Sequence, residues 1–161
     1  MALRDAWFIN GVLYNNEVRG AYAQKHIDGL EVIDHMILKT ILGAQAKATV
    51  ETLYQETGAM SVRNVISVRR MLYLKTILDR EDHEITMKVY VAMKNNTHKG
   101  DWYNLIKEDF AKIGLEIDEE TIIATDKDTF KKLIKSSVWN VFFSRATSKA
   151  IITHKSKEHY L

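Results

Sequence analysis

The amino-acid sequence predicts an all-α fold, a single domain of about six to seven helices. Along most of the 161 residues, apolar side chains recur at steps of three and four, the spacing that places them on one face of an α-helix. The chain has no proline, so the residue that most strongly breaks a helix is missing. No succession of strand, helix and strand patterns indicates a parallel sheet.

The first 22 residues fit two local structures. Their apolar side chains suit an amphipathic helix that contains Gly11, or a pair of strands that turns at Asn15 and Asn16, and we favour the helix. The next segment, 25–42, has a clear helical pattern, and Gly43 follows it as a natural stop.

Hydroxyl residues are expected to cap the two helices that follow. Thr49 precedes a short helix that Gly58 ends, and Ser61 precedes a longer helix over 62–78. The longer helix has a broad apolar stripe and carries a group of basic residues on its other faces. The members of this group are Arg63, Arg69, Arg70 and Lys75.

Two further helices are expected between an acidic turn and Gly114. The first covers about 84–94. The second begins after Asp101, which can cap it, and buries Trp102 among other apolar residues before Gly114 ends it. The segment 115–126 is predicted to be a loop with one short turn.

We expect the chain to divide near residue 125. Residues 1–125 form a helical core, and residues 126–161 form a basic amphipathic helix and tail that pack on the same core. This helix begins at Asp126 or Asp128 and ends near Arg145, and the basic tail beyond it is expected to be frayed. Its predicted inward side chains are Phe130, Leu133, Ile134, Val138, Val141 and Phe142.

Charge is unevenly distributed along the chain. Residues 1–80 carry ten Lys and Arg against eight Asp and Glu, 81–125 carry five against ten, and 126–161 carry eight against three. Basic faces of this size can attract a polyanion, although they do not define a nucleic-acid binder by themselves. A second basic group lies on the last helix and comprises Lys127, Lys131, Lys132 and Lys135, while Tyr22 and Tyr73 can stack on bases.

Several kinds of chemistry are excluded or disfavoured by the sequence. With no cysteine, the chain has no disulfide, no cysteine zinc site and no thiol nucleophile. Asp28, Glu31 and His35 lie on one helix face and can hold a metal only if another helix supplies ligands. No apolar run reaches the roughly 20 residues that span a bilayer, and no signal-peptide pattern is present, so we expect an intracellular protein without a membrane partner.

The sequence contains five short motifs in a characteristic order: INGVLYNNEVRG, LKTILG, AKATVETLYQETG, MSVRNVISVRRMLYLKTIL and AMKNNTHKGDW. They resemble the patterns xNGxLxNSEVWYG, LRRILG, SKTPxExLYLETG, LPIRxIIxxRRLMYLHxIL and AQKxxPxKGDW. These patterns belong to the region that follows the palm in reverse transcriptases of animal non-LTR (LINE-type) retrotransposons. The resemblance covers about 3–159. This sequence departs from the family at Arg19, where an aromatic is usual, and at Thr49, Ser61 and Thr97, where proline is usual.

The resemblance implies a thumb with connecting helices, which grips the RNA/DNA template and primer duplex through its phosphates without reading sequence. Arg63, Arg69, Arg70 and Lys75 are then the first candidates for duplex contact. Lys131, Lys132 and Lys135 are the second. The catalytic aspartates and their Mg²⁺ belong to the palm, outside this chain, so neither a cofactor nor independent catalysis is expected.

A competing interpretation is a helical protein-interaction scaffold, or an inactive retrotransposon-derived remnant. It would use exposed aromatic residues as contacts, and the candidates are Trp7, Trp102, Trp139 and Phe143. The two interpretations differ in where the side chains of Arg63, Arg69 and Arg70 should point. One exposed concave face would favour nucleic acid, whereas pairing with the acidic residues of 79–84 would favour a structural role.

Overall fold

The computed structural model describes residues 3–17, 24–44, 48–95, 98 and 101–158. Side chains are described as far as Phe142, apart from that of Gln24, and for Ser144. Within these ranges the fold is all-α, as predicted, and contains no strand. Its elements are η1 (Arg4–Ile9), α1 (Asn10–Val12), α2 (Gln24–Leu42), α3 (Val50–Thr57), α4 (Val62–Leu78), α5 (Ile85–Asn95), α6 (Trp102–Lys112), α7 (Glu119–Ala124) and α8 (Lys127–Glu158).

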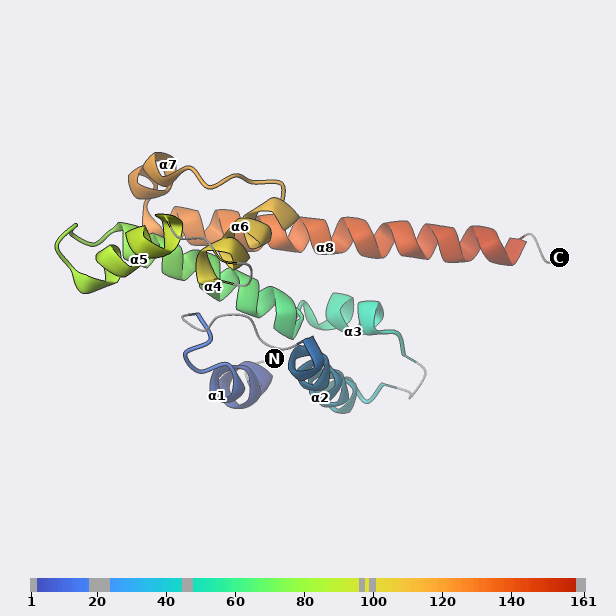
Figure 1. Ribbon diagram of the computed structural model, residues 1–161. Coiled ribbons are helices and arrows are strands. Elements are labelled where there is room, and N and C mark those ends of the chain that lie inside the picture. The colour runs from blue at the N-terminus through green and yellow to red at the C-terminus, as the bar shows by residue number, and fades with distance from the viewer. Residues whose placement is uncertain (1–2, 18–23, 45–47, 96–97, 99–100, 159–161) are drawn as a thin grey trace.

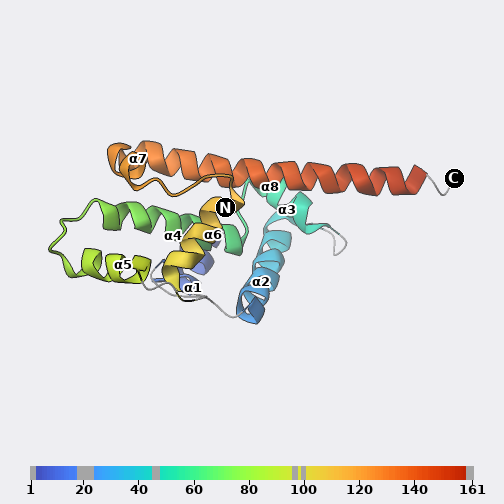
Figure 2. The ribbon, with the colours of Figure 1, turned by 45° about the horizontal axis from the view of Figure 1, so that its top comes forward.

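Helix α4 lies at the centre of the molecule and contacts α2, α5, α6, α7 and α8. In Figures 1 and 2, α8 runs along one side of α4, and α5 and α7 lie near the end of α4 that leads into α5. Helix α6 lies beside the middle of α4, where Asp109 contacts Ser67 and Arg70. The N-terminal helices lie on the side of α4 away from α8 (Figure 1). Because α4 is covered on several sides, its broad apolar stripe is buried.

Three groups of buried side chains form the core. The largest surrounds Met71 and Leu74 of α4 with residues of α6 and α8, including Ile106 and Ile134. A second joins Ile9 and Leu13 to Val62 and Ile66. The third comprises Leu38, Leu53, Tyr54 and Ala59, with Phe142 packed against it. Together these groups hold the N-terminal helices, α4 and the first half of α8 in place.

The predicted boundaries of α3 and α4 are confirmed by their caps. The Thr49 hydroxyl accepts a hydrogen bond from the Thr52 N–H at 3.3 Å, and the Ser61 hydroxyl accepts one from the Asn64 N–H at 3.2 Å. Gly58 ends α3 at φ +63°, in the left-handed region that favours glycine.

Three local predictions need correction. The Asp101 side chain does not cap α6 and instead accepts a hydrogen bond from the His98 N–H at 2.7 Å. The segment expected to be a loop with one short turn contains the helix α7, which Asp118 caps through the Thr121 N–H at 3.4 Å. Leu133 is 46% exposed, because α8 packs through residues spaced four apart, and Leu133 lies beside that stripe.

The last helix also differs from its prediction. Asp126 marks its start, since its Oδ1 accepts a hydrogen bond from the Thr129 N–H at 2.9 Å. Instead of ending near Arg145 in a frayed tail, α8 continues to Glu158. The sequence explains this length, because neither glycine nor proline occurs after Gly114 to stop the helix.

Candidate nucleic-acid interface

Two of the predicted phosphate contacts, Arg70 and Lys75, are buried. Arg70 Nη1 donates to Asp109 Oδ2 at 2.9 Å, and both side chains lie in the core. Lys75 pairs with Asp79 and donates to the Ile123 carbonyl oxygen at 3.1 Å. These cations therefore neutralise carboxylates and satisfy the backbone inside the protein, and in this fold neither offers its charge to an external phosphate.

Arg63 also has internal partners. Its Nη2 lies 3.1 Å from Asp28 Oδ1 and 3.7 Å from Glu31 Oε2, so it joins α4 to α2. The Arg63 side chain is 40% exposed, so it lies near the surface, but its guanidinium already faces two carboxylates. A phosphate would have to compete with this pair.

Arg69 lines a groove that runs beside α4. It fastens the end of α1 to α4, since Nη1 donates to the Leu13 carbonyl at 2.9 Å and Nη2 donates to Asn10 Oδ1 at 2.6 Å. A longer contact of 3.4 Å joins Nη1 to Asn16 Oδ1. Within the described residues these partners are neutral, so the positive charge is not cancelled, and the Nε–H and one Nη2–H have no hydrogen-bond partner there.

The surface beside Arg69 is hollowed into two adjoining parts, which we call the basic groove. The first part, of about 520 Å³, is lined by Lys131 and Lys135 of α8 opposite Asp5 and Asn10. The second, of about 430 Å³, is lined by Lys127 at the start of α8, by Asn10 and by the segment that follows α1. Residues Asn10, Arg69 and Leu72 line both parts, so the two parts adjoin beside α4.

The three groove lysines form a row. Because they are spaced four apart, Lys127, Lys131 and Lys135 share one face of α8, about 6 Å apart along its axis. All three are exposed, and none makes an ion pair or hydrogen bond with the rest of the described chain. Lys132 is exposed as well but does not line the groove.

Other charges in the groove are few or neutralised. Asp5 lines the first part and Glu17 the second. Arg4, which also lines the first part, is buried against Asp34. Tyr73 lines the second part, and its ring packs edge-on against Trp102 at 5.9 Å, whereas Tyr22 lies outside the described residues. The groove is therefore predominantly positive.

A buried polar network, which no sequence pattern indicated, positions one wall of the groove. Arg4 Nη2 donates to Asp34 Oδ2 and to the Met60 carbonyl, each at 2.7 Å, and the Tyr54 hydroxyl donates to Asp34 Oδ2 at 3.0 Å. Burial and the nearby carboxylate raise the pKa of Tyr54. Burial alone would lower the pKa of Arg4, but its hydrogen bond to Asp34 and the charge of that carboxylate raise it. The network locks η1 to α2 and α3.

The possible metal ligands on α2 are engaged elsewhere. Asp28 pairs with Arg63, and His35 Nε2 lies 3.1 Å from the Tyr54 hydroxyl. Among the described residues, no three His, Asp or Glu side chains are arranged to hold a metal ion. The second helix that the metal hypothesis required does not supply ligands within this part of the chain.

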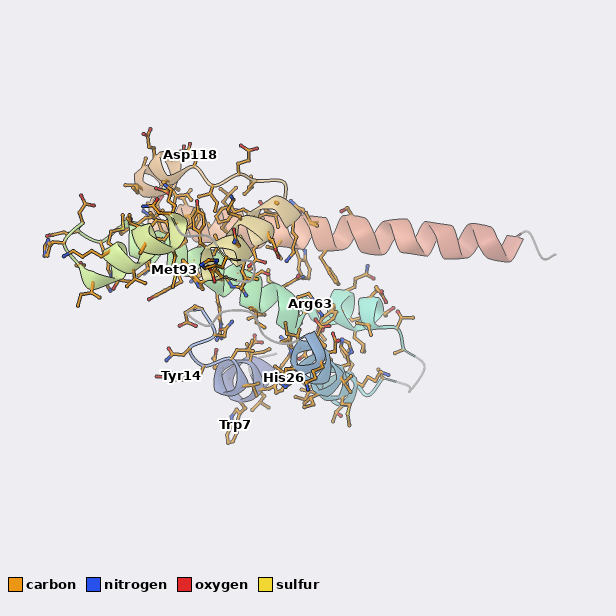
Figure 3. The ribbon with its side chains drawn as sticks, viewed as in Figure 1. Trp7, Tyr14, His26, Arg63, Met93 and Asp118 are labelled. Carbon is orange, nitrogen blue, oxygen red and sulfur yellow. The ribbon has the colours of Figure 1, made fainter. Side chains whose placement is uncertain are left out.

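The aromatic candidates for protein contact differ in how far they are exposed to solvent. Trp7 is 81% exposed and projects away from the helices in Figure 3, whereas Trp102 is buried and Trp139 is half-buried. The side chain of Phe143 lies outside the described residues. Trp7 borders a hollow of about 490 Å³ between η1 and α2, which we call the apolar groove. Its lining includes Leu3, Phe8, Ile33, Met36 and Ile41.

Comparison with known proteins assigns no family to this arrangement. No family model, no curated protein and no solved structure matches the chain. Within the part of the chain that the structure describes, no helix combines the length and apolar character required to cross a bilayer. Functional inference therefore depends on the two grooves and on the motif resemblance.

Proposed function

We propose that this chain is a non-catalytic, thumb-like module that binds an RNA/DNA template and primer duplex through its phosphates inside the cell. The proposal joins the motif resemblance to non-LTR reverse transcriptases with the residues of the basic groove. Catalytic aspartates and Mg²⁺ would be supplied by the palm of the parent polymerase, which is a further candidate partner.

The lysine row beside Arg69 is the observation that supports this proposal. Lys127, Lys131 and Lys135 extend over about 12 Å of α8, a length comparable to three or four phosphates along one strand of a duplex. Lysine side chains without internal partners can approach phosphates without first breaking an ion pair. Phosphate contacts of this kind position a duplex without reading its bases.

The supporting set of cations differs from the one that the resemblance favoured. Arg70 and Lys75 stabilise the core, and Arg63 is paired at the junction of α4 and α2. Arg69, Lys131 and Lys135 remain as groove contacts, and Lys127 joins them. Lys132 serves as an internal comparison, because it lies on the same helix but outside the groove.

Fluorescence anisotropy of the full chain with a blunt RNA/DNA hybrid tests the proposal. We expect the double variant Lys131→Glu and Lys135→Glu to weaken binding by about tenfold or more, because two contacts become repulsive. The matched control, Lys132→Glu with Lys88→Glu, has the same net charge and should bind more tightly than the groove variant. Equal losses in both variants would indicate a diffuse charge effect and contradict the groove assignment.

A second candidate function, a helical protein-interaction scaffold, is favoured by the apolar groove. An exposed tryptophan above contiguous apolar residues is typical of a protein contact, and such patches are rare on monomers. Arg63 and Arg70 do not pair with the acidic residues of 79–84, but with Asp28 and Asp109, and this internal pairing likewise favours a structural role for both arginines. Trp7 does not line the basic groove, so Trp7→Ala should leave hybrid binding unchanged if that groove is the functional surface.

A further inference from the structure

We infer that the second part of the basic groove, beside Tyr14, holds an unpaired nucleobase from a strand whose phosphates follow the lysine row. This inference rests on the proposed function, because the strand must first be held by the groove. It adds a distinct site, a base-stacking pocket, and a distinct ligand, the single-stranded overhang of a duplex.

The pocket is an open hollow with room for one base. Its volume of about 430 Å³ falls within the roughly 300–1,000 Å³ typical of small-ligand sites. Leu72, Tyr73 and Thr76 of α4 line it, together with Tyr14 and Asn15 after α1. Apolar, aromatic and amide groups therefore surround one hollow, a combination suited to a flat heteroaromatic ring.

Tyr14 is the residue on which a base would stack. Its side chain is 75% exposed, and in Figure 3 it projects outward from the segment that follows α1. Among the described residues its ring makes no aromatic contact, unlike Tyr73, which is packed against Trp102. Base stacking on an aromatic ring tolerates any sequence, in agreement with a surface that does not read bases.

Polar groups at the edge of the pocket suit the base edge and its phosphate. Asn10 Oδ1 accepts from Arg69, so the Asn10 Nδ2 amide is left to donate to a base oxygen or nitrogen. Lys127 lines the same pocket and continues the row of Lys131 and Lys135. A strand leaving the row thus reaches Lys127 with its next base beside Tyr14.

The test compares three hybrids with the full chain: a blunt hybrid, the same hybrid with a short unpaired overhang, and a hybrid with an abasic overhang of equal length. The abasic strand keeps its phosphates but has no bases to stack. We expect the natural overhang to bind about fivefold or more tightly than the abasic one. Tyr14→Ala should abolish this difference, whereas Tyr14→Phe, which keeps the ring, should retain it.

The outcomes separate this inference from the function on which it rests. Equal affinity for natural and abasic overhangs, with normal binding of the blunt hybrid, would overturn the base pocket alone. A preference for bases that persists in Tyr14→Ala would overturn the assignment to Tyr14. Failure of all three hybrids to bind at low salt would overturn the proposed function and the pocket together. Tyr14 is exposed, so circular dichroism should show both variants folded.

Discussion

On α4, burial determines whether an arginine pairs inside the protein or lies at a surface groove. Arg70 and Asp109 are both buried and paired, whereas Arg69, one position earlier, lies at a groove with neutral oxygen partners. Adjacent helical residues point about 100° apart, so neighbouring arginines reach different environments. The motif RR therefore combines one structural and one surface cation in this fold.

Asp109→Ala should destabilise the protein strongly. Asp109 accepts hydrogen bonds from Arg70 and from the Ser67 hydroxyl at 2.8 Å, so its removal leaves a buried guanidinium without its counterion. We expect the free energy of unfolding to fall by about 3–5 kcal/mol, measured by urea denaturation. Glu108→Ala, at an exposed neighbouring position, should change it by less than about 0.5 kcal/mol. Similar values for both variants would contradict the importance of the buried pair.

Glu119 should contribute to the acid sensitivity of the fold. Burial alone would raise the pKa of Glu119, but hydrogen bonds from Lys94 at 2.7 Å and from Tyr90 at 2.6 Å lower it. A lowered carboxyl pKa adds stability above the ordinary value of 4.5, and this stability is lost as the pH falls through the folded-state pKa below 4.5.

The variant Glu119→Gln should therefore lose less stability than the parent protein when the pH falls through this range. Urea denaturation at a series of pH values measures the difference. Glu120→Gln, at the exposed adjacent position, should keep the parent pH dependence. A Glu119→Gln profile parallel to that of the parent would contradict the assignment.

At the scale of elements, the boundaries of α3 and α4 were predictable from the sequence. Thr49, Ser61 and Gly58 act through groups only two to four residues away, so the chain sequence contains their whole mechanism. The start of α7 could have been predicted in the same way, because Asp118 stands three residues before Thr121, whose N–H it caps. The end predicted for α8 was too early, because the apolar spacing becomes weak after Arg145. The absence of glycine and proline beyond Gly114 is the feature that agrees with the longer helix.

Ser61→Ala should weaken the start of α4. The hydroxyl of Ser61 satisfies the Asn64 N–H, and loss of such a cap costs about 1 kcal/mol of stability. Thermal or urea unfolding measures this change, and Ser61→Asp should recover most of it because aspartate also caps. Ser136→Ala on the exposed face of α8 provides the control, since that hydroxyl bonds only the Leu133 carbonyl and caps nothing. Equal stability of Ser61→Ala and the parent would contradict the capping role.

At the scale of the whole molecule, the candidate site was only partly predictable. The spacing of Lys131 and Lys135 showed that they share a helix face, but not that α1 lies opposite them. The partners of Arg63 and Arg70 are 35 and 39 residues away, so their pairing depends on tertiary packing. The groove arises from elements at opposite ends of the sequence, which no local pattern describes.

Hybrid binding should depend on salt in proportion to the phosphates contacted. With Lys127, Lys131, Lys135 and Arg69 engaged, the plot of log association constant against log salt should have a slope of about −3 to −4. Replacing Lys131 and Lys135 by alanine should reduce the magnitude of the slope by about 2, because two fewer counterions are released. Lys132→Ala should leave it unchanged. An unaltered slope in the double variant would place the contacts elsewhere on the surface.

The length of α8 has a consequence for how the protein melts. The helix extends 16 residues past Phe142, and among the described elements none lies beside its far end in Figures 1 and 2. Helical segments of that length without tertiary support are marginal in water and unwind gradually on warming. The far-UV signal should therefore decline in a sloping baseline at temperatures where the fluorescence of the packed tryptophans is still native, and the cooperative transition should follow separately.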